Sequence, residues 1–118
     1  MAGPASDLTP FEALLLVAAG SAQADATGIS AKWSPGLIVA AGNDVKGLRL
    51  PPATKGKSFV VKNIGTAGIT STLKVYPATG GQINELGTNN PIVMGQKTST
   101  TFIALSTTQW YTSPTVRS

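Results

Sequence analysis

The sequence of 118 residues contains neither cysteine nor histidine. Without cysteine, the chain cannot form a disulfide, a thiolate metal site or a cysteine nucleophile. Without histidine, it lacks the commonest general base and the commonest metal ligand. We therefore predict that this protein is not an enzyme and that it binds no metal and no cofactor.

Charged residues and long apolar runs are also scarce. Only 12% of the residues are charged, and the net charge is +4. The apolar run Leu14–Ala18 is far shorter than the roughly 20 residues that a membrane span requires, so no membrane partner is expected. The carboxylates are too scattered to predict an acid–base pair or a calcium site; they are Asp7, Glu12, Asp25, Asp44 and Glu85.

Glycine and proline are plentiful by comparison. The chain has 13 glycines and 8 prolines, and 42% of its residues are apolar. The apolar content and the small net charge argue against intrinsic disorder. The length corresponds to one domain that can bury a core without covalent cross-links. This composition is typical of a turn-rich β protein.

The stretch from Leu48 to Gly81 has the clearest pattern in the chain. Leu48 and Leu50 alternate with Arg49, and the same period of two recurs at residues 73–75. This period indicates strands with one face in a core and the other face outside. Each run is followed by a Pro-Ala-Thr-x-Gly turn, at residues 52–56 and 77–81. Proline presets the first corner of a turn and glycine accepts the positive φ that closes it.

Other short apolar runs between turns complete the predicted fold. Many short strands at even spacing favour an all-β protein, namely a single small antiparallel β-sandwich or jelly-roll-like barrel. We place this domain at residues 13–113 and a C-terminal tail at residues 114–118. The remaining runs are Ile29–Trp33, Leu37–Ala41, Phe59–Val61, Ile83–Leu86, Ile92–Met94, Thr100–Leu105 and Gln109–Thr112.

The segment around residues 10–19 allows more than one interpretation. Thr9, Pro10 and Glu12 fit a helix N-terminus with a capping box, and Gly20 fits its end. The run Leu14–Ala18 also fits a short buried strand, which we favour because the residues that follow are strand-like. A signal peptide fits less well, because no lysine or arginine precedes the apolar run.

Residues 1–12 are predicted to form an extended N-terminal arm. The segment is small and polar, contains proline and has no periodicity, so it does not belong to the sandwich core. Leu8 and Phe11 are the apolar side chains that could anchor it. We expect these two residues to contact a neighbouring subunit or another protein.

A phosphate-binding loop is the first functional motif to consider, and it is not supported. Gly56-Lys57-Ser58 resembles the end of such a loop. However, Pro51 stands where the first glycine of the loop should be, and a strand follows where a helix is required.

A basic cluster and three aromatic residues are the other candidates for binding. On alternation, Arg49 and Lys62 face away from the core, but few aromatic residues lie between the basic ones, so nucleic acid is not the expected partner. Trp33, Trp110 and Tyr111 could stack on a glycan, although a core or subunit-interface role is more common for such residues. The basic cluster consists of Lys46, Arg49, Lys55, Lys57 and Lys62.

Several segments together resemble structural proteins of tailed phages, over roughly residues 18–112. The segments that carry this resemblance are Ala18–Ala26, Leu48–Gly56, Val61–Gly65, Val75–Asn84, Thr101–Ala104 and Trp110–Thr112.

This resemblance implies a small β-sandwich or jelly-roll module on a phage particle, often a trimeric capsid decoration (cement) protein or a head-fibre base. It implies no catalytic residues. We accordingly expect a homotrimer that binds the major capsid protein on the capsid surface after assembly in the host cytoplasm. The expected capsid or subunit contacts are Leu8, Phe11, Trp33, Arg49, Lys62 and Trp110. The alternative is a head-fibre or tail-fibre module that recognises a host surface glycan.

Overall fold

The computed structural model describes residues 13–43, 45–65 and 71–113. In these ranges the chain forms two β-sheets and two short 3-10 helices, and it contains no α-helix. The all-β class is therefore confirmed. The predicted N-terminal arm with Leu8 and Phe11, and the predicted C-terminal tail, lie outside the described residues.

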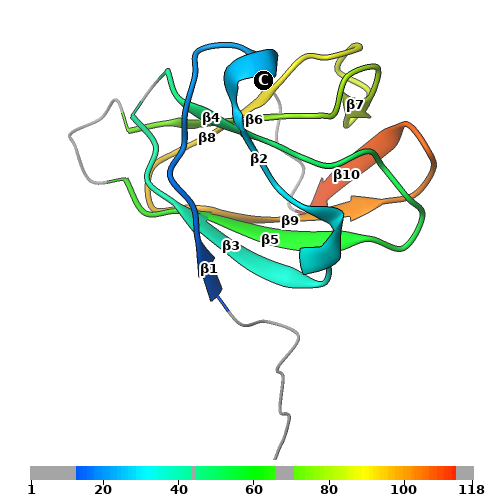
Figure 1. Cartoon of the computed structure of the whole chain (residues 1–118), viewed down its shortest axis with the longest axis horizontal. Coiled ribbons are helices and arrows are strands. Elements are labelled where there is room, and N and C mark those ends of the chain that lie inside the picture. Colours follow the sequence, from blue (N-terminus) through cyan, green and yellow to red (C-terminus); the bar gives the residue numbers. More distant parts are fainter. Residues whose placement is uncertain (1–12, 44, 66–70, 114–118) are drawn as a thin grey trace, which may run out of the picture.

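Two sheets face each other in Figure 1, with the four-stranded sheet above the six-stranded one. Across the six-stranded sheet the order is β1 (Ala13–Leu15), β3 (Gly36–Ala40), β5 (Ser58–Asn63), β9 (Ser99–Ala104), β10 (Gln109–Ser113) and β7 (Gln82–Ile83). Across the four-stranded sheet the order is β2 (Thr27–Gly28), β4 (Gly47–Arg49), β6 (Leu73–Tyr76) and β8 (Ile92–Met94). The 3-10 helices are η1 (Gln23–Asp25) and η2 (Ala31–Trp33).

The sheets are mixed, so the prediction of an antiparallel fold is wrong. From β1 to β9 the chain passes from one sheet to the other at every step. Each strand up to β6 therefore lies parallel to the strand two places earlier, as in the windings of a β-solenoid. The direction then reverses, because β8 runs antiparallel to β6 and β9 runs antiparallel to β5. Up to β9, crossovers between the sheets replace the hairpin connections that would give antiparallel neighbours, whereas β9 and β10 form a hairpin.

A single apolar core lies between the sheets, and the alternation of the sequence decides which side chains enter it. Leu48 and Leu50 are fully buried while Arg49 is only half-buried, as predicted. Phe59 and Val61 enter the core from β5 of the opposite sheet, whereas Val60 points outward. A period of two therefore predicts the buried face correctly on both sheets.

The first segment of the domain is a strand, as favoured over a helix. Residues 13–15 form β1 at the edge of the six-stranded sheet, parallel to β3. The run Ile29–Trp33 differs from the other runs, because η2 occupies its second half. Ser30 caps η2 by accepting a hydrogen bond from the amide of Lys32 at 3.2 Å.

Glycine closes both Pro-Ala-Thr turns. Gly56 ends the first turn with φ +95°, and Gly80 lies inside the second with φ +87°. Both values lie in the left-handed region that side chains disfavour. The two turns place residues 52–53 and 78–81 along the same pocket.

Asn63 joins the two sheets through its buried side-chain amide. Its Oδ1 accepts hydrogen bonds from the amides of Gly42 (2.8 Å) and Gly65 (2.9 Å). Its Nδ2 donates to the carbonyl oxygens of Ser71 (2.7 Å), Met94 (3.3 Å) and Gly95 (3.0 Å). One side chain therefore binds backbone groups from several segments, including Met94 at the end of β8 in the opposite sheet.

Candidate functional site

An apolar surface covers the outward side of β1, β3 and β5. We call this surface the outer apolar face and define it as Leu15, Val17, Leu37, Val39 and Val60. The strand register places Leu15 beside Val39, and Leu37 beside Val60. All of these side chains point away from the core, because their sequence neighbours are the ones that enter it. The face is therefore continuous across three strands.

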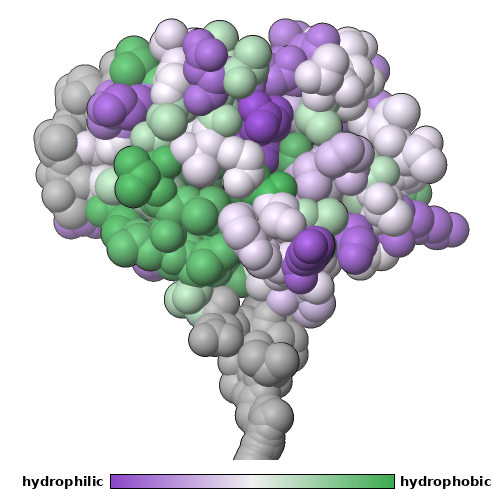
Figure 2. All heavy atoms as spheres, in the orientation of Figure 1, coloured by the Kyte–Doolittle hydropathy of each residue, from purple (hydrophilic) through white to green (hydrophobic). Residues whose placement is uncertain are grey.

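Leu15 and Val17 are the most exposed members of this face, at 70% and 80% of their surface. They belong to a segment, residues 13–18, in which apolar side chains alternate between the core and the outside. The segment carries no charge, proline or bulge, which are the usual devices that prevent an edge strand from associating with another chain. Figure 2 shows the resulting hydrophobic area over β1 and β3.

Beyond β5 the outward side of the sheet is mixed, because the exposed Ile103 of β9 lies among polar residues. Lys62 borders the outer apolar face next to Val39, and Thr101 lies beside Val60 on β9. On β10, Tyr111 donates a hydrogen bond from its hydroxyl to Oε2 of Glu85 at 2.7 Å. That hydrogen bond, followed by loss of hydration and by the negative charge of Glu85, raises the pKa of Tyr111 above its ordinary value of 10.0.

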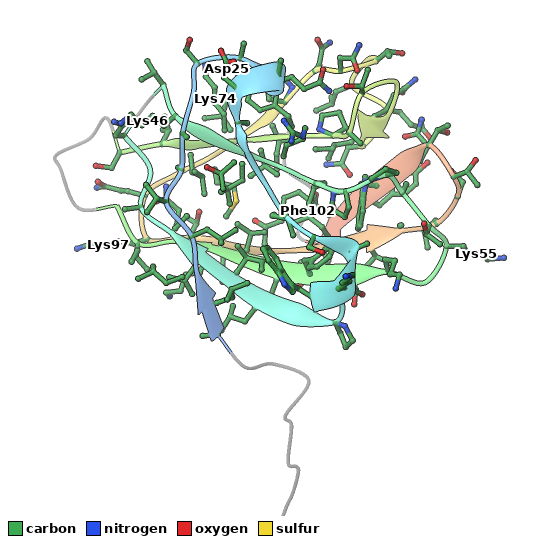
Figure 3. All side chains as sticks on the ribbon, in the orientation of Figure 1. Asp25, Lys46, Lys55, Lys74, Lys97 and Phe102 are labelled. Carbon is green, nitrogen blue, oxygen red and sulfur yellow. The ribbon has the colours of Figure 1, made fainter. Side chains whose placement is uncertain are left out.

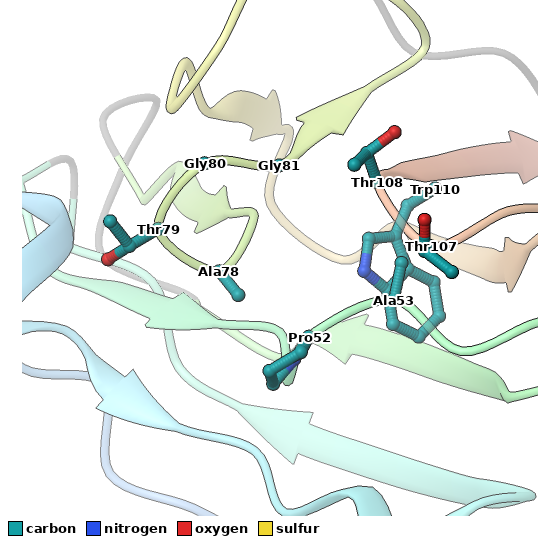
Figure 4. A pocket seen from close by; sticks show the side chains of 9 residues that line it. All are labelled: Pro52, Ala53, Ala78, Thr79, Gly80, Gly81, Thr107, Thr108 and Trp110. Atoms are coloured by element: carbon teal, nitrogen blue, oxygen red, sulfur yellow. The ribbon is translucent and has the colours of Figure 1, made fainter.

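A second feature, the Arg49 depression, lies at the four-stranded sheet. It is an open hollow of about 590 Å³. It adjoins a smaller pocket of about 110 Å³ (Figure 4) that ends on the edge of Trp110. Both are lined by small residues, and they share Pro52, Ala78 and Thr79. The residues that line the Arg49 depression are Gly28, Ile29, Ser30, Ala31, Arg49, Leu50, Pro51, Pro52, Ala78 and Thr79.

Arg49 points away from the core, as predicted, but its contacts are made within the chain. Its Nη1 donates to the carbonyl oxygens of Gln23 (2.9 Å), Ala24 (3.3 Å) and Ala26 (3.3 Å). These contacts hold η1 and the residues after it against the outward side of β4. The sequence placed the side chain on the correct side but gave no indication of these partners.

Trp110 is a core residue, and it therefore has no role at a surface. Its side chain has no exposed area, its Nε1 donates to the carbonyl oxygen of Pro51 at 3.3 Å, and its ring lies 5.8 Å from that of Phe59. A side chain without accessible surface can contact neither a neighbouring subunit nor a sugar. Trp33 is 36% exposed, so it stays available for contact.

The basic cluster of the sequence does not form one patch in space. Figure 3 shows Lys46 and Lys97 at one end of the molecule and Lys55 at the other end. Lys62 lies on the outward side of the six-stranded sheet, while Arg49 lies on the four-stranded one. Closeness in sequence is lost because the chain changes sheets between these residues.

Within residues 13–43, 45–65 and 71–113, no three acidic side chains are close enough to hold a metal ion together. The same residues include no helix with the length and hydropathy of a membrane span.

The fold and the two surface features define an all-β protein in which two mixed sheets share one core. In comparisons with protein-family models, curated proteins and solved structures, no match to this chain was found. The phage family implied by the sequence resemblance therefore stays a proposal.

The outer apolar face and the Arg49 depression were both missed at the level of sequence. The signal for the face was present, since residues 13–18 are apolar at every position. The pattern predicts a short buried strand, because a sequence does not distinguish burial in a core from exposure at an interface. The depression has no comparable signal, since it is formed by small residues from distant segments.

Proposed function

We propose that this chain is a structural assembly protein that associates with other copies of itself and with a larger particle. In its most specific form, the proposal is a capsid decoration protein of a tailed phage, which binds the major capsid protein as a homotrimer on the outside of the virion. The sequence resemblance supports binding to a phage particle, and the outer apolar face supports association between copies of the chain.

The outer apolar face is the observation that carries this proposal. An apolar surface that extends over three strands costs free energy in water, and soluble monomers rarely leave such surfaces uncovered. Full burial of one leucine or valine side chain contributes roughly 1.5–3 kcal/mol. Burial of Leu15, Val17 and their neighbours against another subunit would therefore stabilise an assembly substantially.

For the finer architecture, we propose a sandwich-like packing of the two mixed sheets. The single core that receives Leu48 from one sheet and Phe59 from the other supports this description. The parallel windings up to β6 give the sandwich a solenoid-like connectivity in place of jelly-roll hairpins.

Electron microscopy of particles assembled with and without the protein tests the proposed role. We expect regularly spaced density on the capsid exterior only when the protein is present. Particles that look identical in both preparations would contradict a decoration role, even if the free protein forms trimers.

Glycan recognition is the second candidate, and the Arg49 depression is the observation that favours it. Its volume falls within the range of roughly 300–1,000 Å³ that is common for small-ligand sites. If the protein is a fibre module, glycan binding should occur here and not at the buried Trp110. A glycan array probed with the full chain would test this candidate, and an array without any bound glycan would reject it.

A further inference from the structure

The Arg49 depression contains a guanidinium group whose orientation is fixed by the fold. Nη1 alone contacts three carbonyl oxygens, those of Gln23, Ala24 and Ala26. Since all three lie in or next to η1, they hold the guanidinium plane against that turn. A group held in this way loses little conformational entropy when it binds a ligand.

The opposite edge of the same guanidinium has no partner among the described residues. Arginine has five N–H donors, and the three on Nε and Nη2 make no hydrogen bond to any residue that the structure describes. Gly28 on β2 is the residue paired with Arg49 on β4. Nη2 of Arg49 lies over Gly28, only 3.1 Å from the position that a Cβ on Gly28 would take. Glycine at this position leaves room for the guanidinium above the strand.

This free edge has the geometry that recognises a carboxylate. Nε and Nη2 can donate two parallel N–H···O bonds to the two oxygens of one carboxylate group. The partners of Nη1 are neutral carbonyl oxygens, so they do not neutralise the charge of Arg49. A negatively charged ligand would therefore find both a charge and two directed donors.

We propose that the Arg49 depression binds the carboxylate of an acidic sugar. The carboxylate lies against Nε and Nη2 of Arg49, and the sugar ring packs on Pro52. The exposed hydroxyl of Thr79 has no hydrogen-bond partner among the described residues, and in the complex it forms a hydrogen bond with a hydroxyl group of the sugar ring. The depression has a volume of about 590 Å³ and is lined mostly by small residues, which suits one or a few compact sugar rings. This site is independent of the outer apolar face, which lies on the other sheet.

Titration of the full chain with glucuronate, followed by amide NMR shifts, tests the proposal. We expect shifts at the amides of Gly28, Ser30 and Thr79. Glucose and the methyl ester of glucuronic acid share the ring but lack the charge, and they should bind at least about tenfold more weakly. Equal binding of the neutral sugars, or an absence of shifts at these amides, would overturn the proposal.

Two variants separate ligand recognition from folding. Arg49→Lys keeps the charge but removes the paired donors, so the affinity for glucuronate should fall by about tenfold or more. Because this change also removes the contacts to η1, Thr79→Val provides a second test. It preserves the shape of the side chain and all contacts of Arg49, and it should weaken binding without changing the melting temperature.

Lys97→Asn is the matched control for charge. It removes one positive charge from the turn between β8 and β9, which does not line the depression, at a position with φ +59° that asparagine tolerates. We expect its affinity for glucuronate to equal that of the wild type. An equal loss in Lys97→Asn and Arg49→Lys would show non-specific attraction only and would reject the site. Binding of an acidic peptide at these residues, with no binding of glucuronate, would reject the ligand class.

Discussion

At the scale of single residues, Asn63 makes contacts that require a side-chain carboxamide, which both accepts and donates hydrogen bonds. Its amide accepts two hydrogen bonds and donates three, and the side chain is fully buried. An amide is the only side-chain group that offers an acceptor and two donors of this shape in a neutral form. Asn63 therefore acts as a structural connection between segments that the strands alone would not fix.

Replacement of Asn63 by alanine should destabilise the protein strongly. Each buried backbone group left without a partner costs about 1–3 kcal/mol, so we expect a loss of about 3 kcal/mol or more in the free energy of unfolding. Urea denaturation measures this loss. Asn43→Ala is the control, because the exposed Asn43 also accepts two backbone hydrogen bonds. A similar loss in both variants would show that burial of the Asn63 network is not the cause.

Tyr76 and Tyr111 provide a test of the side-chain environment through pH. Burial raises the pKa of Tyr76, and the hydrogen bond to Glu85 is the main cause that raises the pKa of Tyr111. Because the pKa values of both tyrosines are raised in the folded state, their contribution to the stability of the fold is fully present below pH 10. It is lost as the pH rises through the folded-state pKa values, because the folded state disfavours the ionised tyrosines.

These are the only two tyrosines of the chain, so a spectrophotometric titration at alkaline pH reports on both. We expect both to ionise above pH 10.0. In Glu85→Gln, one of the two transitions should move back toward the ordinary value. Unchanged titration of Glu85→Gln would contradict the assignment of this hydrogen bond.

At the scale of elements, alternation predicted which side chains are buried but not which strands are neighbours. Leu48, Arg49 and Leu50 alternate in the same way whether the adjacent strand is parallel or antiparallel. The choice between hairpins and crossovers depends on contacts between distant residues, which a local pattern does not contain. Because a local pattern contains no information on distant contacts, it also does not decide between a core role and an interface role for Trp110. For the same reason it predicts a buried strand where β1 has an exposed outer face.

The predicted N-terminal arm, residues 1–12, offers a test that separates binding from folding. Deletion of residues 1–10 should weaken binding to particles strongly while the remaining domain still folds. Phe11→Ala should produce a smaller loss of the same kind, because it removes one of the two predicted apolar anchors. Occupancy on purified particles and the melting temperature of the free protein are the two measurements. A truncated protein that decorates particles normally would show that the arm is not an anchor, and one that fails to fold would show that it belongs to the domain.

At the scale of the whole molecule, stability should not depend on metal ions. The chain has no cysteine or histidine, and the described residues contain no cluster of acids. We therefore expect that no metal ion contributes to the free energy of folding. We expect the same melting temperature with and without a chelator. A lower melting temperature in the chelator would reveal a site that neither the sequence nor the described structure contains.

The proposed assembly of subunits depends on the outer apolar face being an interface. Leu15→Asp places a charge on this face at a side chain that is already 70% exposed, so the fold of the subunit should be unaffected. Leu105→Asp is the matched control, because Leu105 is 56% exposed but does not belong to the face.

The most direct measurement is therefore the mass of the three proteins in solution by sedimentation velocity. We predict trimers for the wild type and for Leu105→Asp, and monomers for Leu15→Asp, because a charge buried in the interface would be unpaired. A monomeric wild type, or a Leu15→Asp variant that remains trimeric, would contradict the claim that this face joins the subunits.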